Sequence, residues 1–252
     1  MVTTSYSDDF IDGGRSVDAG RGLGWITGGW QLAGRQLGVF IGIVVVYVLL
    51  SIVVGIVPFI GSLAIALLQP VFDGGIMLGC DALRRGEPLR LGHLFAGFDR
   101  HAGKLIALGA VKLAAIVVML LIAFLVVGSS LFSLFAGGGN LSPDQAAAVF
   151  TSVLLFALIM LALSVPVYMA LWFAPSLIVL GEFDVMPALK LSFNACLKNI
   201  LPFLVWGIVF FVLAIVASLP LMLGWLLLGP VLFSSVYLAY REIFHSSGAA
   251  AA

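Results

Sequence analysis

The chain has 252 residues, of which 62% are apolar and only 10% are charged, and its mean hydropathy is +1.21. This composition excludes a soluble globular domain, because too little polar surface remains to cover it, and it predicts that the bilayer is the solvent. The formal net charge of zero is uninformative, since the basic residues are grouped along the chain. Two cysteines, Cys80 and Cys196, are too few for a disulfide framework, and we expect free thiols.

Twelve Lys and Arg residues fall into short stretches that long apolar runs separate. These stretches are the N-terminal segment, residues 84–112, Lys190 with Lys198, and Arg241. Cytoplasmic ends of membrane helices collect Lys and Arg. The grouping therefore predicts a multi-pass membrane protein with its N- and C-termini in the cytoplasm.

A helical crossing of the bilayer needs about 20 apolar residues. Six crossings fit the sequence, at about 37–57, 61–83, 105–135, 146–180, 201–218 and 222–241. We therefore predict an all-α fold, a polytopic membrane bundle of six transmembrane helices in a single domain over 21–244. Residues 1–20 and 245–252 are predicted to be disordered.

Turn residues mark the connections between these crossings. Pro58 with Gly61, and Pro220, predict turns after the first and fifth spans. Gly137–Gly139 and Asn140, without a basic neighbour, predict an outside loop, and Ser142-Pro143-Asp144-Gln145 has the pattern of a capped helix start.

Each returning span contains a Pro-Val pair. The pairs are Pro70-Val71, Pro166-Val167 and Pro230-Val231, and Pro175 follows in the long fourth span. Proline inside a helix removes a backbone hydrogen bond and commonly kinks the helix. We therefore expect kinks at Pro70, Pro166, Pro175 and Pro230.

An aromatic residue followed five or six positions later by a basic one precedes each outgoing span. The pairs are Trp30 with Arg35, Phe98 with Lys104, and Phe193 with Lys198. Together with the Pro-Val pairs they indicate three repeats of interfacial segment, outgoing helix and returning helix. The alternative is that this pattern is what any interfacial helix shows.

The interfacial segments have helical apolar spacing, as in Leu23, Ile26 and Trp30, and in Leu91, Leu94 and Phe98. This predicts amphipathic helices that lie on the cytoplasmic leaflet and attract anionic headgroups through their basic residues. Membrane lipids are therefore the expected partners, beside a second copy of the chain or another membrane protein.

Several short motifs carry a family resemblance. They are Gly86-Glu87-Pro88-Leu89, Leu94-Phe95-Ala96-Gly97-Phe98, Gly24-Trp25, Gly29-Trp30 and Pro70-Val71-Phe72. Over roughly residues 20–245 the chain resembles a family of uncharacterised bacterial integral membrane proteins and, more remotely, the YciC-type inner-membrane proteins. The resemblance implies a six-span helical protein of the bacterial cytoplasmic (inner) membrane, and it brings no activity, cofactor or catalytic residue.

Polar residues inside the spans are candidates for function, because an ionisable group within the bilayer is costly. Gln69 and Asp73 lie inside the second span and Lys112 inside the third. One interpretation is an ion pair between Asp73 and Lys112 that ties two helices together, or side chains that reach for opposite interfaces. The other is a transport site at a Pro-broken helix.

Glycines at four-residue spacing form two ridges, Gly34, Gly38 and Gly42, and Gly75 with Gly79. Small faces let helices approach closely in lipid. We expect packing of the first span on the second, with dimerisation as the alternative.

No metal-ligand spacing, nucleophile motif or phosphate-binding loop is present in the sequence, so we expect no enzyme activity and no cofactor. Sparse basic residues give no support to nucleic-acid binding. The sequence thus favours a non-enzymatic integral membrane protein that acts through lipid or protein contacts in membrane organisation or assembly. The alternative is a small transporter that uses Asp73.

Overall fold

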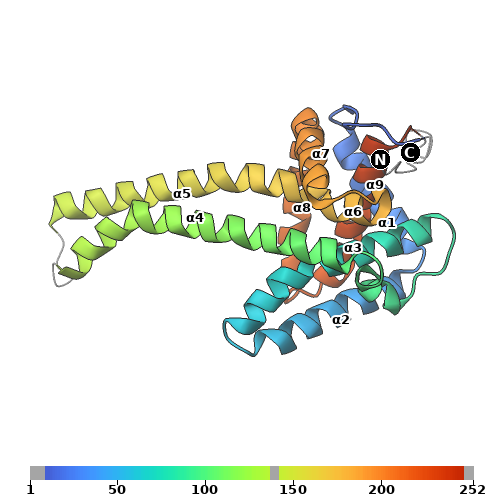
Figure 1. The fold of residues 1–252 in the computed structure, drawn as a ribbon, viewed down its shortest axis with the longest axis horizontal. Coiled ribbons are helices and arrows are strands. Elements are labelled where there is room, and N and C mark those ends of the chain that lie inside the picture. Colours follow the sequence, from blue (N-terminus) through green and yellow to red (C-terminus); the bar gives the residue numbers. More distant parts are fainter. Residues whose placement is uncertain (1–8, 137–141, 247–252) are drawn as a thin grey trace. The chain divides into compact units, whose positions relative to one another are not determined.

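The computed structural model describes residues 9–136 and 142–246, and these residues form helices without named strands. Figure 1 shows the elements in chain order. They are α1 (Arg21–Gly34), α2 (Leu37–Gly55), α3 (Ile60–Arg84), the 3-10 helix η1 (Leu91–Phe98), α4 (Ala102–Ala136), α5 (Pro143–Trp172), α6 (Ala174–Gly181), α7 (Val185–Lys198), α8 (Ile200–Ser218) and α9 (Trp225–Phe244).

Six helices of the described chain are long and apolar enough to cross a membrane. They cover Leu37–Gly55, Ile60–Arg84, Ala102–Leu125, Pro143–Gly181, Ile200–Ser218 and Trp225–Phe244. The predicted fold class, an all-helical membrane protein, is confirmed.

Two compact units make up the structure, and the single domain over 21–244 stays a prediction. Unit 1 is Met1–Gly109 with Met169–Ala252, and unit 2 is Ala110–Tyr168, which includes parts of α4 and α5. In unit 2 large apolar side chains such as Leu121 and Phe124 are exposed. Such a surface suits a lipid environment, because acyl chains solvate apolar side chains.

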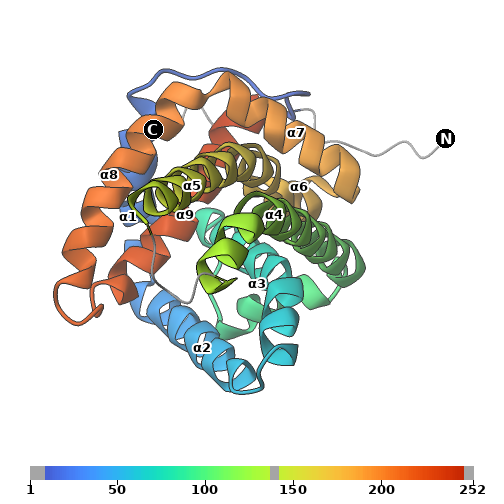
Figure 2. The same ribbon diagram turned by 90° about the vertical axis from the view of Figure 1, so that its left-hand side faces the viewer.

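The core of unit 1 is built around α3 and α9. In their membrane-crossing windows 44% and 61% of the residues are buried, against 11% for α2 and 17% for α8. Figure 2 shows α1 beside α9, and the fully buried Trp25, Phe40, Tyr237 and Tyr240 lie in this core. The two least apolar of the six candidate spans are thus central, and the more apolar α2 and α8 face outward.

The four prolines at the predicted kinks occupy two kinds of helix position. Pro70, Pro166 and Pro230 lie inside α3, α5 and α9, which continue through them. Pro175 instead stands in the first turn of α6, after a break at Phe173, which is a favourable proline position because no intrahelical N–H is needed there.

The capped helix start is confirmed, since Ser142 and Gln145 exchange bonds between side chain and backbone N–H at 3.0 and 3.3 Å. The predicted outside loop, Gly137–Gly139 and Asn140, lies outside the described residues.

Residues 9–20 have a defined path, in contrast to the predicted disorder of residues 1–20. Phe10 pairs with His245, and the Ile11 and Arg15 amides donate to the Phe244 and Ile243 carbonyls at 2.8 and 2.9 Å. The predicted disorder of residues 1–8 and 247–252 lies outside the described residues.

Candidate functional site

Each interfacial helix packs on a returning helix of unit 1. Helix η1 lies on α3, α7 lies on α6, and α1 lies on α9, the last helix of the chain. The order of interfacial helix, outgoing helix and returning helix thus occurs three times, and the first interfacial helix meets the last returning helix. This arrangement supports the repeat interpretation.

Two of these contacts, α1 on α9 and η1 on α3, depend on a glycine that directly precedes the aromatic residue of the predicted repeat. A Cβ on Gly29 of α1 would stand 3.0 Å from the Val231 carbonyl oxygen of α9. A Cβ on Gly97 of η1 would collide with the Val71 carbonyl oxygen of α3. Both carbonyls belong to a Pro-Val pair, so the repeated motifs meet at a backbone contact too close for any larger residue.

In the third contact a serine takes the place of the glycine. The Ser192 hydroxyl of α7 donates to the Met169 carbonyl at 2.7 Å and accepts from the Phe173 amide at 2.9 Å. These two groups flank the break between α5 and α6, where backbone groups lose their helical partners. Ser192 therefore provides hydrogen-bond partners for backbone groups at the break between α5 and α6.

The basic residues of two repeat pairs, Arg35 and Lys104, bind backbone carbonyls near the ends of returning helices. Arg35 donates to the Leu83 carbonyl at 3.4 Å. Lys104 donates to the Glu182 and Phe183 carbonyls at 3.2 and 3.4 Å, and its ammonium lies 2.7 Å from Asp184. A cation is favourable at a helix C-terminus, where carbonyls lack helical partners.

Lys198 differs in that its target is the N-terminal segment along α9. Its ammonium donates to the Gly13 and Gly14 carbonyls at 2.9 and 3.1 Å. The neighbouring Asn199 is fully buried, accepts from the Val17 amide at 2.9 Å, and donates to the Arg15 and Ala195 carbonyls at 2.9 and 2.8 Å. The start of α8 thus holds residues 13–17 in place.

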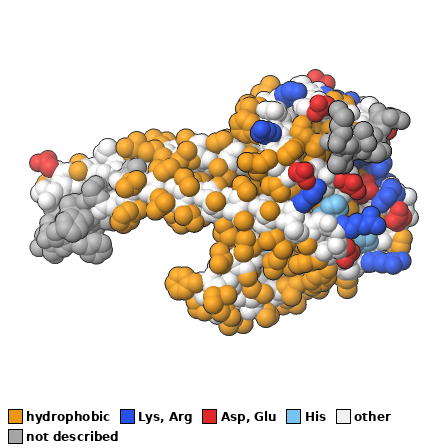
Figure 3. All heavy atoms as spheres, in the orientation of Figure 1, with side chains coloured by type: hydrophobic (Ala, Val, Ile, Leu, Met, Phe, Trp, Pro, Cys, Tyr) orange, Lys and Arg blue, Asp and Glu red, His pale blue; other side chains and the backbone are white. Residues whose placement is uncertain are grey.

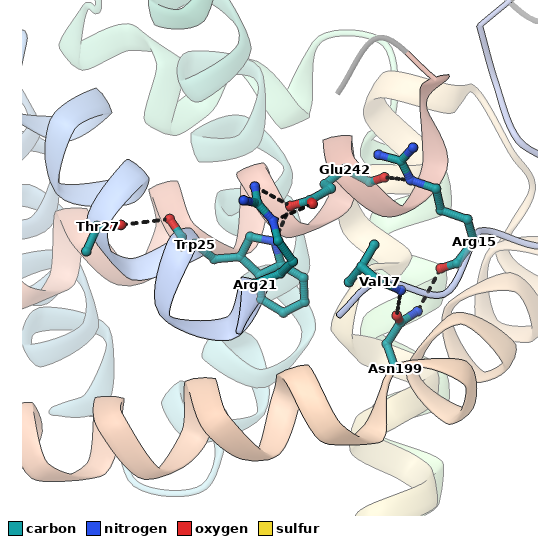
Figure 4. Close-up of polar contacts among 8 residues, drawn as sticks. Arg15, Val17, Arg21, Trp25, Thr27, Asn199 and Glu242 are labelled. Atoms are coloured by element: carbon teal, nitrogen blue, oxygen red, sulfur yellow. Dashed lines mark hydrogen bonds and ion pairs between the residues drawn. The ribbon is translucent and has the colours of Figure 1, made fainter. Parts of the chain in front are cut away.

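A buried carboxylate joins the two ends of the chain (Figure 4). Glu242 of α9 is 8% exposed, and its oxygens accept from the Arg21 guanidinium at 2.6 and 3.1 Å and from the Trp25 indole N–H at 2.7 Å. Arg15 donates to the Glu242 carbonyl at 2.7 Å. Both carboxylate oxygens of Glu242 thus accept hydrogen bonds, as a buried charge requires.

A second polar cluster joins α3 to α9. The Tyr237 hydroxyl donates to Asp81 at 2.6 Å and accepts from Arg84 at 2.8 Å. Arg85 lies 3.2 Å from the same carboxylate. Asp81 is therefore shared by Tyr237 and two arginines at this end of unit 1.

The predicted intramembrane site is divided between the two units. Gln69 and Asp73 are partly buried on α3 in unit 1, next to Phe72, whose ring centroid is 5.6 Å from that of Tyr47 on α2. Lys112 belongs to unit 2. The pairing of Asp73 with Lys112 stays a prediction.

The glycine ridges do not make the predicted contact between the first and second spans. Gly34 and Gly38 have open space where a Cβ would stand, and Gln36 between them separates α1 from α2. Gly42 approaches the Leu91 side chain of η1. Gly75 approaches the His93 and Leu94 carbonyl oxygens, and Gly79 the Leu89 side chain. The absence of a side chain at Gly42, Gly75 and Gly79 therefore allows η1 and the segment before it to approach closely.

Catalytic chemistry finds no support among these groups. The described part of the chain holds no cluster of three His, Cys, Asp or Glu side chains that could bind a metal. Cys80 and Cys196 are free and buried, and burial raises the pKa of the Cys196 thiol to about 12, so this thiol is not a ready nucleophile.

The outer faces of the interfacial helices combine apolar and basic side chains (Figure 3). Trp30 of α1 is 52% exposed, Leu91 of η1 51% and Met186 of α7 63%. Exposed Arg90, Arg100 and Lys190 lie on or beside these helices. An amphipathic surface of this composition suits the boundary between acyl chains and headgroups.

Sequence reasoning missed Glu242, Asp81 and Asn199. Glu242 bonds to residues 217 and 221 positions away, and Asp81 to one 156 positions away. The sequence indicates the role of the two acids only weakly, because a single acid near a basic residue at a helix end commonly lies in solvent.

Comparison with known proteins identifies one relative. The chain is 30% identical over 208 residues to a probable inner membrane protein of Burkholderia thailandensis, and the match covers 80% of this chain and 76% of the relative. No family model and no solved structure matches. With its six apolar helices, the chain is an integral membrane protein and belongs to the family of this probable inner membrane protein.

Proposed function

We propose that the protein is a non-enzymatic membrane protein that acts through its three interfacial helices, which bind anionic lipid headgroups and organise the membrane around them. The observation that carries this proposal is the outer face of α1, η1 and α7. There, exposed Trp30, Leu91 and Met186 lie beside exposed basic residues, while the inner faces pack on returning helices. Basic residues near an anionic surface contribute about 1 kcal/mol each.

The proposed orientation places this end of unit 1, with both termini, in the cytoplasm. Eleven of the twelve basic residues belong to unit 1 and Lys112 alone to unit 2. The positive-inside rule supports this orientation. A reporter that fluoresces only in the cytoplasm, fused after residue 252, should be active, and a periplasm-specific phosphatase fused there should be inactive. We also propose that the family extends to the YciC-type inner-membrane proteins.

Lipid retention tests the headgroup contacts. The double variant Arg90→Gln/Arg100→Gln should retain severalfold less phosphatidylglycerol than wild type when native mass spectrometry follows extraction in mild detergent. Arg85→Gln is the matched control, because it removes a charge at the same end that Asp81 already pairs. Equal retention by the double variant and the control would contradict the proposal.

A transporter is the second candidate, and the partly buried position of Asp73 beside Phe72 and near Tyr47 favours it. Such a function predicts that Asp73→Asn abolishes proton-coupled solute flux into reconstituted vesicles. A scaffold predicts no flux in either protein and unchanged lipid retention in the variant.

A further inference from the structure

The turns at the opposite end of unit 1, between α2 and α3 and between α8 and α9, contain no polar side chain. From Ile52 to Gly61 every side chain is apolar, and from Leu219 to Phe233 the indole N–H of Trp225 is the one polar side-chain group. Phe59 and Leu221 are each 90% exposed within the protein. Turns that face water ordinarily carry Asn, Asp or Ser as well as Gly and Pro, so the absence of these three polar residues makes the two turns unusual.

The backbone conformation of these turns is unfavourable for the large apolar residues that occupy them. Phe59, Leu221 and Met222 have φ angles of 61°, 51° and 64°, a region that Gly and Asn adopt far more readily than bulky apolar residues. The chain therefore accepts strain at three positions where a polar or glycine residue would relieve it. An apolar environment explains this choice of residues, because a polar side chain is unfavourable in hydrocarbon and a large apolar side chain is favourable.

Backbone donors in the turn between α8 and α9 are satisfied within the turn. The amides of Leu221, Met222, Leu223 and Gly224 donate to carbonyls of the same turn at 2.9–3.2 Å, and Pro220 has no N–H. Internal satisfaction is required wherever a backbone meets hydrocarbon, since water is absent there.

The polar side chains nearest the same turn are satisfied in the same way. The Trp225 indole donates to the Ser218 hydroxyl at 3.0 Å, and this hydroxyl donates to the Ala214 carbonyl at 2.8 Å. Trp225 thus directs its N–H inward, although an interfacial tryptophan commonly offers it to headgroups or water.

The turn between α2 and α3 is likewise closed by backbone hydrogen bonds from two of its amides. The Ile60 and Gly61 amides donate to the Pro58 and Val57 carbonyls at 2.7 and 2.9 Å, and Pro58 has no N–H. A Cβ on Gly61 would collide with the Val54 carbonyl oxygen, so glycine is needed to close the turn.

Helix lengths agree with an end inside the bilayer. Helices α2 and α8 have 19 residues each, which corresponds to about 28 Å, close to the roughly 30 Å of the hydrocarbon core. Helix α4 has 35 residues, about 52 Å, which is enough to cross and emerge.

We propose that the turns at Phe59 and Leu221 end among the acyl chains of the far leaflet. The α2–α3 and α8–α9 hairpins then enter the bilayer from the charged end without emerging, whereas the start of α5 at Ser142 and Asp144 reaches water. Lipid acyl chains are the partner of both turns.

Cysteine accessibility tests this proposal. Phe59→Cys and Leu221→Cys are made in the full chain, beside Asp144→Cys as the matched control and wild type, whose Cys80 and Cys196 are buried. A charged, membrane-impermeant maleimide is applied to both faces of reconstituted proteoliposomes, and each rate is divided by the rate for the same variant in detergent.

The expected result is a normalised labelling rate at positions 59 and 221 below one-tenth of that at 144. A rate above one-tenth at either position overturns the proposal for that hairpin. If either variant fails to accumulate, Ile60→Cys and Leu219→Cys, whose side chains are 71% and 76% exposed within the protein, replace it with the same threshold.

Discussion

The two ends of unit 1 differ in what holds them together. At the charged end, Glu242, Asn199 and Asp81 join segments far apart in the sequence through directed hydrogen bonds. At the other end, the turns around Phe59 and Leu221 make backbone bonds within themselves and expose apolar side chains. The comparison teaches that the specific tertiary contacts lie mainly at the charged end, and that the solvent required by the other end is apolar.

The largest effect should come from Glu242→Ala, which leaves the Arg21 guanidinium and the Trp25 indole without their acceptor in a buried place. Breaking a buried charge pair costs about 3 kcal/mol of the free energy of unfolding. Thermal unfolding in a mild detergent measures it, with Glu87→Ala, whose side chain is 56% exposed, as the control. Equal melting temperatures for both variants would show that the charged end does not depend on this carboxylate.

A methyl group at the contact between η1 and α3 should have the next largest effect. Gly97→Ala would collide with the Val71 carbonyl, and overpacking of this kind costs about 2 kcal/mol. Gly92→Ala, in the same 3-10 helix, meets nothing within 4 Å and should change the free energy of unfolding by less than about 0.5 kcal/mol. Matching losses in the two variants would refute the close contact.

The effect of a substitution at the apolar end on the free energy of unfolding should have opposite signs in water and in hydrocarbon. Asn adopts a positive φ more readily than Leu, so Leu221→Asn would stabilise a turn in water. In hydrocarbon the unsatisfied amide should destabilise it by about 1–2 kcal/mol. Unfolding of wild type and variant in lipid nanodiscs separates the two cases, and higher stability of the variant would contradict an apolar solvent at this end.

The smallest effect should be a pH dependence from His245 at the charged end. Burial first, then the neighbouring Arg241, lowers the pKa of this imidazole from 6.5 to about 4. The unfolded chain binds a proton here at a higher pH than the folded one, so stability is full above pH 6.5 and falls as the pH drops toward 4. Melting temperatures between pH 7.5 and 4.5 measure it.

Substitution of the same histidine isolates this contribution. The variant His245→Gln should lose part of the decline, whereas His93→Gln should keep it. An unchanged slope in His245→Gln would assign the decline to other groups.

The helices could be predicted because membrane burial acts on local composition. The six apolar runs, the Ser142 and Gln145 cap and the order of interfacial, outgoing and returning segments are each encoded within neighbouring residues. Pro175 shows the limit, since a proline inside an apolar run indicates a break without saying whether the helix bends or begins anew.

The polar contacts could not be predicted because their partners are distant in the chain. Glu242 and Arg21 stand 221 positions apart, and nothing near either residue indicates the other. The packing partners of the glycine ridges could not be predicted for a related reason, because glycine spacing indicates a small helix face without indicating which element packs on it. For Gly75 that partner is the short η1 and not the neighbouring span.

The packing of α1 on α9 sets an order on biogenesis. The surface of α9 that α1 contacts, including Glu242 and the Val231 carbonyl, is synthesised more than 190 residues after α1. Until α9 has entered the membrane, Arg21 and Trp25 lack the Glu242 carboxylate as an acceptor. Helix α1 is therefore made well before α9 but reaches its final position only after it.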